Sequence, residues 1–74
     1  MKFTWGSAVR IRADAPAALR PGEYGNVCAV IEVETSEQAE AHGVPIGGFV
    51  FTVEYADGSE AVVPEEWLEP DLPD

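Results

Sequence analysis

Strict alternation of apolar side chains is the feature of this sequence that most limits its fold. From Phe49 to Tyr55, every second residue is large and apolar or aromatic. Side chains along a β-strand point to opposite faces in turn, so a period of two predicts a strand with one buried face. Elsewhere too, apolar residues alternate rather than recur every three or four positions. We therefore expect an all-β protein.

The same pattern predicts further strands separated by turn residues. They are expected at residues 8–12, 26–34 and 60–63, with a brief fifth strand before the C-terminus. Asp57 and Gly58 favour a tight hairpin. Pro64 is expected to begin a short helical turn before the last strand. In the strand at 26–34, alternation places four residues on one face: Val27, Ala29, Ile31 and Val33.

Between the strands we expect one long loop and one short helical turn. Residues 14–21 contain two prolines and several alanines, and the glycine-rich stretch 20–25 then reads as a turn. Thr35 and Gln38 form a Thr-x-x-Gln capping box, and Gly43 is the expected C-terminal cap. The short helix should therefore begin after Thr35 and end before Gly43.

Short strands in 74 residues bury an apolar face best when the sheet curls. We expect one domain over residues 1–74, a strongly bent five-stranded antiparallel sheet or small barrel, with residues 70–74 as a mobile tail. The segments Asp57-Gly58-Ser59 and Val63-Pro64-Glu65-Glu66-Trp67-Leu68 resemble the distal hairpin, 3₁₀ turn and last strand of SH3-like barrels. The stretch Arg20-Pro21-Gly22-Glu23-Tyr24-Gly25-Asn26-Val27 resembles the glycine turn of KOW-type barrels.

Charge is distributed very unevenly along the chain. It has 4 basic and 14 acidic residues, a formal net charge of −10, and no Lys or Arg follows Arg20. Such a surface repels phosphate backbones and anionic lipid and attracts basic proteins. We expect a basic protein partner, no nucleic acid and no membrane. Arg10 and Arg12 should project from the first strand toward Glu32 and Glu34 on the next.

Enzyme chemistry and cofactors find little support in the residues. His42 lies in a polar segment without a nucleophile at a recognisable spacing, and adjacent glutamates at 65 and 66 point in different directions. One Cys and one His are too few for zinc, and the Asp57 segment is too short for a calcium loop. We expect a protein that is not an enzyme and has no metal or cofactor.

Cys28 and the absence of targeting signals indicate the cytoplasm. A single cysteine cannot form an intramolecular disulfide, which fits a reducing compartment. No run of 18 apolar residues and no secretion signal is present. Cys28 itself lies in an apolar run and is expected to be a buried small side chain, the alternative being a reactive thiol.

Two surfaces are candidates for the partner site. One is the outer sheet face, where an apolar stripe of Cys28, Val30, Val50, Thr52 and Val62 lies beside Glu32, Glu34, Glu54 and Glu60. The other is the acidic C-terminal end, where Trp67 is either an interface anchor or the lid of the core. Two alternatives to the first remain open: the bent strands bury part of both faces, or the early loop covers this side. The candidate residues are Val50, Glu54, Asp57, Glu60, Val62, Glu65, Glu66, Trp67, Glu69 and Asp71.

The opening Phe3-Thr4-Trp5-Gly6 and the closing Val63-Pro64-Glu65-Glu66-Trp67-Leu68-Glu69 resemble an SH3-like immunity family of bacterial polymorphic toxin systems. This resemblance implies a small protein, a monomer or weak dimer, that neutralises a cognate toxin by tight binding. The rival hypothesis is an SH3-like accessory subunit of a larger enzyme complex.

Overall fold

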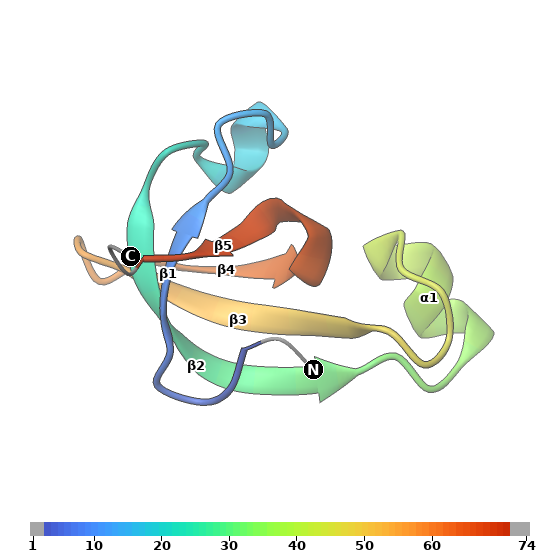
Figure 1. The fold of residues 1–74 in the computed structure, drawn as a ribbon. Coiled ribbons are helices and arrows are strands. Elements are labelled where there is room, and N and C mark those ends of the chain that lie inside the picture. Colours follow the sequence, from blue (N-terminus) through green and yellow to red (C-terminus); the bar gives the residue numbers. More distant parts are fainter. Residues whose placement is uncertain (1–2, 72–74) are drawn as a thin grey trace.

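The structure is a computed structural model that describes residues 3–71, and strands make up most of it (Figure 1). In chain order the elements are β1 (Ala8–Ile11), the 3₁₀ helix η1 (Ala17–Leu19), β2 (Tyr24–Glu32), α1 (Ser36–His42), β3 (Phe49–Tyr55), β4 (Glu60–Pro64), the 3₁₀ helix η2 (Glu65–Trp67) and β5 (Leu68–Pro70). The all-β prediction is confirmed, and each predicted strand is present within two residues of its expected bounds.

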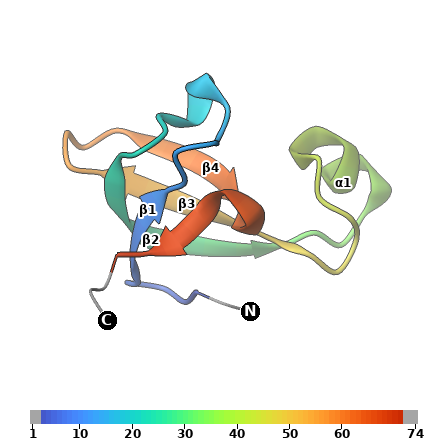
Figure 2. The same cartoon turned by 45° about the horizontal axis from the view of Figure 1, so that its top comes forward.

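All five strands form one antiparallel sheet in the order β4-β3-β2-β1-β5. The nine-residue strand β2 is shared: its beginning pairs with β1, and its remaining length pairs with β3. Figures 1 and 2 show β2 curving, so that β1 and β5 turn across the layer of β3 and β4. β4 and β5 are the two edges of the sheet, which is strongly bent but not closed into a barrel.

The core lies on the concave side of this bend. Val9 and Ile11 of β1 meet Phe51 and Val53 of β3 there, and none of the four exposes any surface. Phe3 adds an aromatic ring from outside the sheet, edge-on to Phe51 with the ring centroids 5.8 Å apart. Both layers of the bent sheet therefore share one apolar core.

A β-bulge interrupts the regular pairing of β2 with β3. Val27 pairs with Val53 and Ala29 pairs with Thr52, so Cys28 is an extra residue on β2. An extra residue shifts the alternation of all residues after it by one position. The predicted common face on this strand is therefore wrong for the residues beyond the bulge: Ala29, Ile31 and Val33 lie opposite Val27.

The predicted capping box and the predicted Asp57-Gly58 hairpin are confirmed, whereas the loop expected at 14–21 contains η1 and the turn expected at 20–25 ends where β2 begins at Tyr24. Thr35 Oγ1 accepts from the Gln38 amide and Gln38 Oε1 accepts from the Thr35 amide, each at 3.1 Å. Gly43 closes α1 in the left-handed region at φ 68°. Gly58 takes a φ of 87° in the β3–β4 hairpin. Local sequence rules therefore account for both connections.

The C-terminal part of the described chain is tied to β1. Pro70 is the last residue of β5, and the Asp71 amide donates to the Ala8 carbonyl oxygen at 3.1 Å. The rest of the predicted mobile tail, residues 72–74, lies outside the described residues.

Candidate docking surface

The convex side of the sheet carries the residues of interest. Cross-strand partners share a face. Asn26, Glu54 and Glu60 form one row across β2, β3 and β4, and Ala29, Thr52 and Val62 form the next. Both rows lie opposite the core residue Phe51 by alternation. We define the open outer face by these residues together with their neighbours on the same side: Ala8, Tyr24, Asn26, Cys28, Ala29, Thr52, Glu54, Glu60, Val62 and Asp71.

Val50 belongs to the convex side but is covered, so its predicted role as a partner contact is wrong. It exposes no surface, and Val33 exposes none either. A Cβ on Gly48, which shares a face with Val50, would lie only 2.5 Å from Val44 Cγ1. The segment after α1 therefore lies close to this end of the sheet. The burial of Val50 and Val33 fits the alternative that part of both faces is buried.

Val30, Glu32 and Glu34 do not lie in the outer stripe in which they were predicted. Val30 pairs with Phe51 and packs against the core, because the bulge at Cys28 reverses its direction. Glu32 pairs with Phe49 and so lies on the side of Phe51 rather than of Thr52, and Glu34 comes after the end of β2. Of the predicted stripe, Cys28, Thr52 and Val62 stay on the open outer face, with Val62 40 % exposed.

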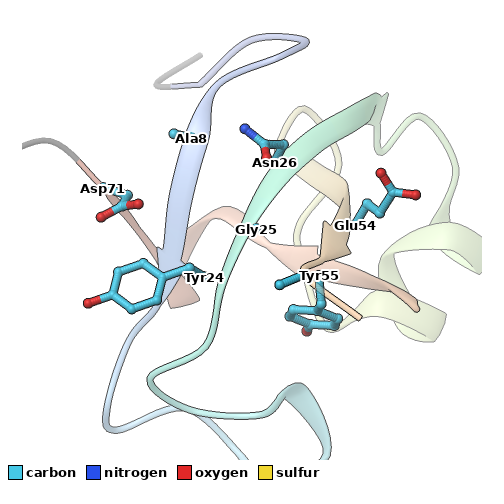
Figure 3. A pocket seen from close by; sticks show the side chains of 8 residues that line it. Ala8, Tyr24, Gly25, Asn26, Glu54, Tyr55 and Asp71 are labelled. Atoms are coloured by element: carbon cyan, nitrogen blue, oxygen red, sulfur yellow. The ribbon is translucent and has the colours of Figure 1, made fainter. Parts of the chain in front are cut away.

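A hollow of about 360 Å³ lies in the open outer face where β2 bends (Figure 3). Gly25 and Ala8 are lining residues that contribute little or no side chain. In Figure 3, Tyr24 and Asp71 lie on one side of Gly25, and Glu54 lies on the other. A Cβ on Gly25 would lie 2.5 Å from the Glu54 carbonyl oxygen, so the close approach of β2 and β3 requires glycine here. The complete lining is Ala8, Tyr24, Gly25, Asn26, Glu54, Tyr55, Ala56 and Asp71.

Tyr24 is held in place at the edge of this hollow although it is 49 % exposed. The Arg10 guanidinium lies 5.9 Å from the centroid of its ring, and Arg10 also binds Glu69 at 2.6 Å. Hydrogen bonding to Tyr24 and to Glu69 raises the pKa of Arg10 above its usual range. Glu69, predicted to be free for a partner, is therefore paired within the chain.

The predicted pairs between the first strand and Glu32 and Glu34 are wrong. β1 pairs with residues 24–26 of β2, far along the strand from Glu32. Arg12 instead binds Asp14 at 3.1 Å. The long overhang of β2 beyond β1, which the sequence does not reveal, separates these charges.

Trp5 is an exposed aromatic residue that sequence reasoning did not include in the site. It is 74 % exposed, yet its Nε1 donates to the Cys28 carbonyl oxygen at 2.9 Å. The hydrogen bond fixes the indole beside the open outer face at the bulge. The position of this tryptophan in a short opening segment, next to Gly6 and outside any predicted strand, was the sequence feature that could have indicated its exposure.

Cys28 is half-buried on the convex side rather than in the core. Burial, and then the negative charges of Glu60 and Glu54, raise the pKa of its thiol. The Sγ atom lies 3.9 Å from Glu60 Oε2. A thiol held protonated beside carboxylates lacks the thiolate character that a reactive cysteine needs.

The predicted acidic C-terminal end is not one surface. Glu65 and Glu66 line a separate hollow of about 180 Å³ beside Val44, whereas Trp67 is half-buried against the core as its lid. Glu69 faces Arg10 and Asp71 lines the larger hollow. The single turn of η2, followed directly by the extended strand β5, distributes these side chains over different sides of the molecule.

Asp57 belongs to an arginine clamp, which we define as Arg20, Glu23, Tyr55, Asp57 and Ser59. Arg20 lies 4.4 Å above the Tyr55 ring and binds Asp57 at 3.1 Å and Glu23 at 3.6 Å. Hydrogen bonds from the Ser59 side chain and amide, and then from Arg20, hold the pKa of Asp57 well below its usual range. Asp57 is therefore committed to the fold and not free for a partner.

Other chemical possibilities are limited within residues 3–71. No group of three or more His, Cys, Asp or Glu is placed there to hold a metal ion. His42 stands in the last turn of α1, half-buried, away from the hollow's lining. No helix in the described part of the chain is long and apolar enough to cross a membrane.

Comparison of the chain with protein-family models, curated proteins and solved structures found no match.

Proposed function

We propose that this chain is an acidic, non-enzymatic binding module that docks a basic protein on its open outer face. One observation carries the proposal: every arginine is already paired with a carboxylate of the same chain. Glu54, Glu60 and Asp71 make no ion pair among the described residues and lie on a face with exposed Tyr24. This surface is complementary to positive charge and carries aromatic contact area, a combination common in protein interfaces.

We further propose that the bent sheet is an open variant of the SH3-like arrangement. The order of strands, with β1 between β5 and β2, supports this reading. The 3₁₀ helix η2 between β4 and β5 supports it as well. Small bent sheets of this kind present their outer faces and loops to partners, which agrees with a binding role.

The most concrete version of the proposal is an immunity protein that neutralises a cognate bacterial toxin in the cytoplasm. Toxins that cut nucleic acids have basic clefts that attract phosphate. An acidic protein competes with phosphate for such a cleft, and long-range attraction accelerates its capture. Neutralisation would then require no catalytic step by this chain.

The test is to express this protein with the polypeptide encoded beside it in the genome of its source. We expect the neighbouring product to stop growth alone and to be harmless with this chain. The purified pair should associate at least ~10-fold more slowly at ~500 mM than at ~50 mM salt, because exposed charges are screened.

A salt-independent association rate would contradict acidic steering. Stable, stoichiometric copurification with a metabolic enzyme, with no protection from a toxin, would instead establish the rival hypothesis of an accessory subunit. Both experiments use the full chain.

A further inference from the structure

We propose that the free edge of β4 binds an extended segment of the partner as an additional strand of the sheet. This inference rests on the proposed function, since it takes the partner to be a basic protein, and it adds the place and the geometry of the contact. The segment runs antiparallel to β4, with a lysine or arginine opposite Glu60 and a β-branched residue opposite Val62.

β4 has backbone groups on one side that no neighbouring strand uses. It ends the sheet, with β3 as its strand partner on the other side (Figure 2). An edge strand presents unpaired N–H and C=O groups, which act as a template for a further strand. Of the two edge strands, β4 offers the longer template, because it has five regularly paired residues whereas β5 has three.

The pairing with β3 determines which backbone groups of β4 point outward. The Tyr55 amide donates to the Ser59 carbonyl oxygen at 2.8 Å, so this first pair of the hairpin is hydrogen-bonded. Hydrogen-bonded and non-hydrogen-bonded pairs alternate along an antiparallel ladder. Glu60, Val62 and Pro64 therefore belong to non-hydrogen-bonded pairs. The backbone polar groups of these three residues point away from β3.

Pro64 and Val62 agree with this assignment. Proline has no N–H, and within sheets it occurs on edge strands where an N–H would face solvent. The side chain of Val62 is exposed. Within residues 3–71, neither Glu60 nor Val62 makes a backbone hydrogen bond to any segment beyond the β3–β4 ladder. The outward N–H and C=O groups of these two residues are therefore open to an additional strand.

The charges beside this edge select a basic segment. Glu60 is exposed, and Glu54 lies directly opposite it on β3. Like charges on adjacent strands disfavour each other, and neither carboxylate makes an ion pair in the described part of the chain. Glu60 can exchange its 3.9 Å contact with Cys28 Sγ for an ion pair with a lysine or arginine on the added strand. A second copy of this chain, with its net charge of −10, would instead be repelled.

Val62 determines the second contact. It pairs with Thr52, and both are β-branched residues on the open outer face. β-branched side chains on adjacent strands pack well against one another. A β-branched residue on the added strand would cover Val62 and continue this row. In the antiparallel direction, the partner segment therefore has a β-branched residue followed two positions later by a basic one.

The experiment is an NMR titration of the full-length ¹⁵N-labelled protein with the blocked hexapeptide acetyl-Thr-Thr-Ile-Thr-Lys-Thr-amide. Its isoleucine can pair with Val62 and its lysine with Glu60, both as hydrogen-bonded pairs. We expect the amide signals of β4 to shift selectively, with weak, millimolar affinity. In the free protein, the amides of Glu60 and Val62 should exchange with solvent faster than those of Ala61 and Val63, whose N–H groups face β3.

Matched peptides separate backbone pairing from charge attraction. N-methylation of isoleucine and lysine removes the N–H groups that face β4, and should weaken binding at least ~10-fold. N-methylation of the two threonines that flank isoleucine removes N–H groups on the far side, and should leave binding nearly unchanged. Glutamate in place of lysine should weaken binding about fivefold, because it meets Glu60 and the acidic surface.

Variants of the protein connect the shifts to the edge. Val62→Pro removes the outward N–H and should abolish the shifts in β4. Val62→Thr keeps the N–H and the branched Cβ, and should bind as the unchanged protein does. Glu60→Gln should weaken binding of the lysine peptide about threefold, whereas the matched control Glu37→Gln on α1 should not. If Val62→Pro does not fold, the two N-methylated peptides still test the inference.

Equal binding of the two N-methylated peptides, or a Val62 amide as protected from exchange as that of Val63, would overturn the inference. Shifts in β4 that depend on protein concentration without peptide would assign the edge to a second copy and overturn it too. Protection from a toxin that persists in Val62→Pro would remove the edge contact and keep the proposed function. Selective peptide binding without such protection would keep the edge contact and remove the immunity function.

Discussion

The arginine clamp and the hollow contain similar side chains but differ in what they do with them. Each has a tyrosine and two carboxylates. The clamp also contains Arg20, which joins the segment after η1 to the β3–β4 hairpin and lies on the nearly buried Tyr55. The hollow has no cation in its lining, and its half-exposed Tyr24 lies beside Arg10, which is bound to Glu69 outside the hollow.

This difference separates a structural use of charge from a binding use. In the clamp, the charges satisfy one another, so that removing a member should affect folding. In the hollow, Glu54 and Asp71 have no ion-pair partner among residues 3–71, so a cation from outside would be needed to pair them. Stability measurements and binding measurements should therefore respond to different residues.

The largest expected effect comes from truncating the two tyrosines. Tyr55→Ala should lower the free energy of unfolding by about 3 kcal/mol or more, because it removes a buried ring. Tyr24→Ala should cost less than about 1 kcal/mol, as is usual for exposed positions. Urea unfolding of both variants measures the two losses in the free energy of unfolding.

If Tyr55→Ala does not fold, a milder variant still allows the stability of the two regions to be compared. Tyr55→Phe removes only the hydroxyl that donates to the Leu19 carbonyl oxygen at 2.9 Å, with an expected loss of about 1 kcal/mol. Equal losses for truncation at the two tyrosines would remove the distinction between the regions.

The second effect compares a glycine from each region. Gly25→Ala should cost about 2 kcal/mol, because its Cβ would meet the Glu54 carbonyl oxygen and Val53 Cγ1 at 2.5 and 2.6 Å. Gly58→Ala has free space around it, and should cost about 1 kcal/mol for its positive φ alone. Thermal and urea unfolding give both values. A harmless Gly25→Ala would show that β2 and β3 need not approach so closely at the hollow.

The third effect concerns association with a basic partner at low salt. Glu54→Lys/Asp71→Lys should slow association about 10-fold, because both charges lie on the proposed docking surface. Glu37→Lys/Glu40→Lys changes the net charge equally and should slow it only about two- to threefold through the general field. Stopped-flow mixing at ~50 mM salt resolves the rates. Equal slowing by the two double variants would mean that total charge matters and position does not.

The smallest effect is the pH dependence of the clamp. In the folded protein, the pKa of Asp57 lies well below the ordinary value for an aspartate, because of hydrogen bonds from Ser59 and Arg20. A depressed carboxyl pKa stabilises the fold above the unfolded value and loses this contribution as pH falls through the folded one. The difference in Tm between the unchanged protein and Asp57→Ala should therefore be constant from pH 7 to about 5 and shrink between about pH 4 and 2. A difference that grows on acidification would contradict the assigned direction.

Much of the fold follows from short-range rules. The alternation from Phe49 to Tyr55 gives β3 with its observed bounds, and Asp57-Gly58 gives the hairpin. Thr35 and Gln38 give the start of α1. In each case the interacting residues are only a few positions apart, so a short stretch of sequence is enough to predict the interaction.

The docking surface could be predicted only in part, because its geometry depends on long-range pairing. The Arg10–Glu69 pair joins residues 59 positions apart. No short sequence pattern predicts such a pair. Val50 is fully buried on the convex side, and no pattern within its own strand predicts this. The hollow requires the bend of β2 at Gly25, although Tyr24-Gly25-Asn26, with small Gly25 between two larger residues, was a usable signal.

The bulge at Cys28 has a consequence for how relatives of this protein would look. Before the bulge, odd-numbered residues of β2 face the core. After it, even-numbered residues do. A homologous chain without the extra residue would carry its apolar positions one place earlier from there to the end of β2. Two such sequences could share a backbone and a core, yet their hydrophobicity profiles, compared position by position without a gap, would be inverted along the strand that connects both halves of the sheet.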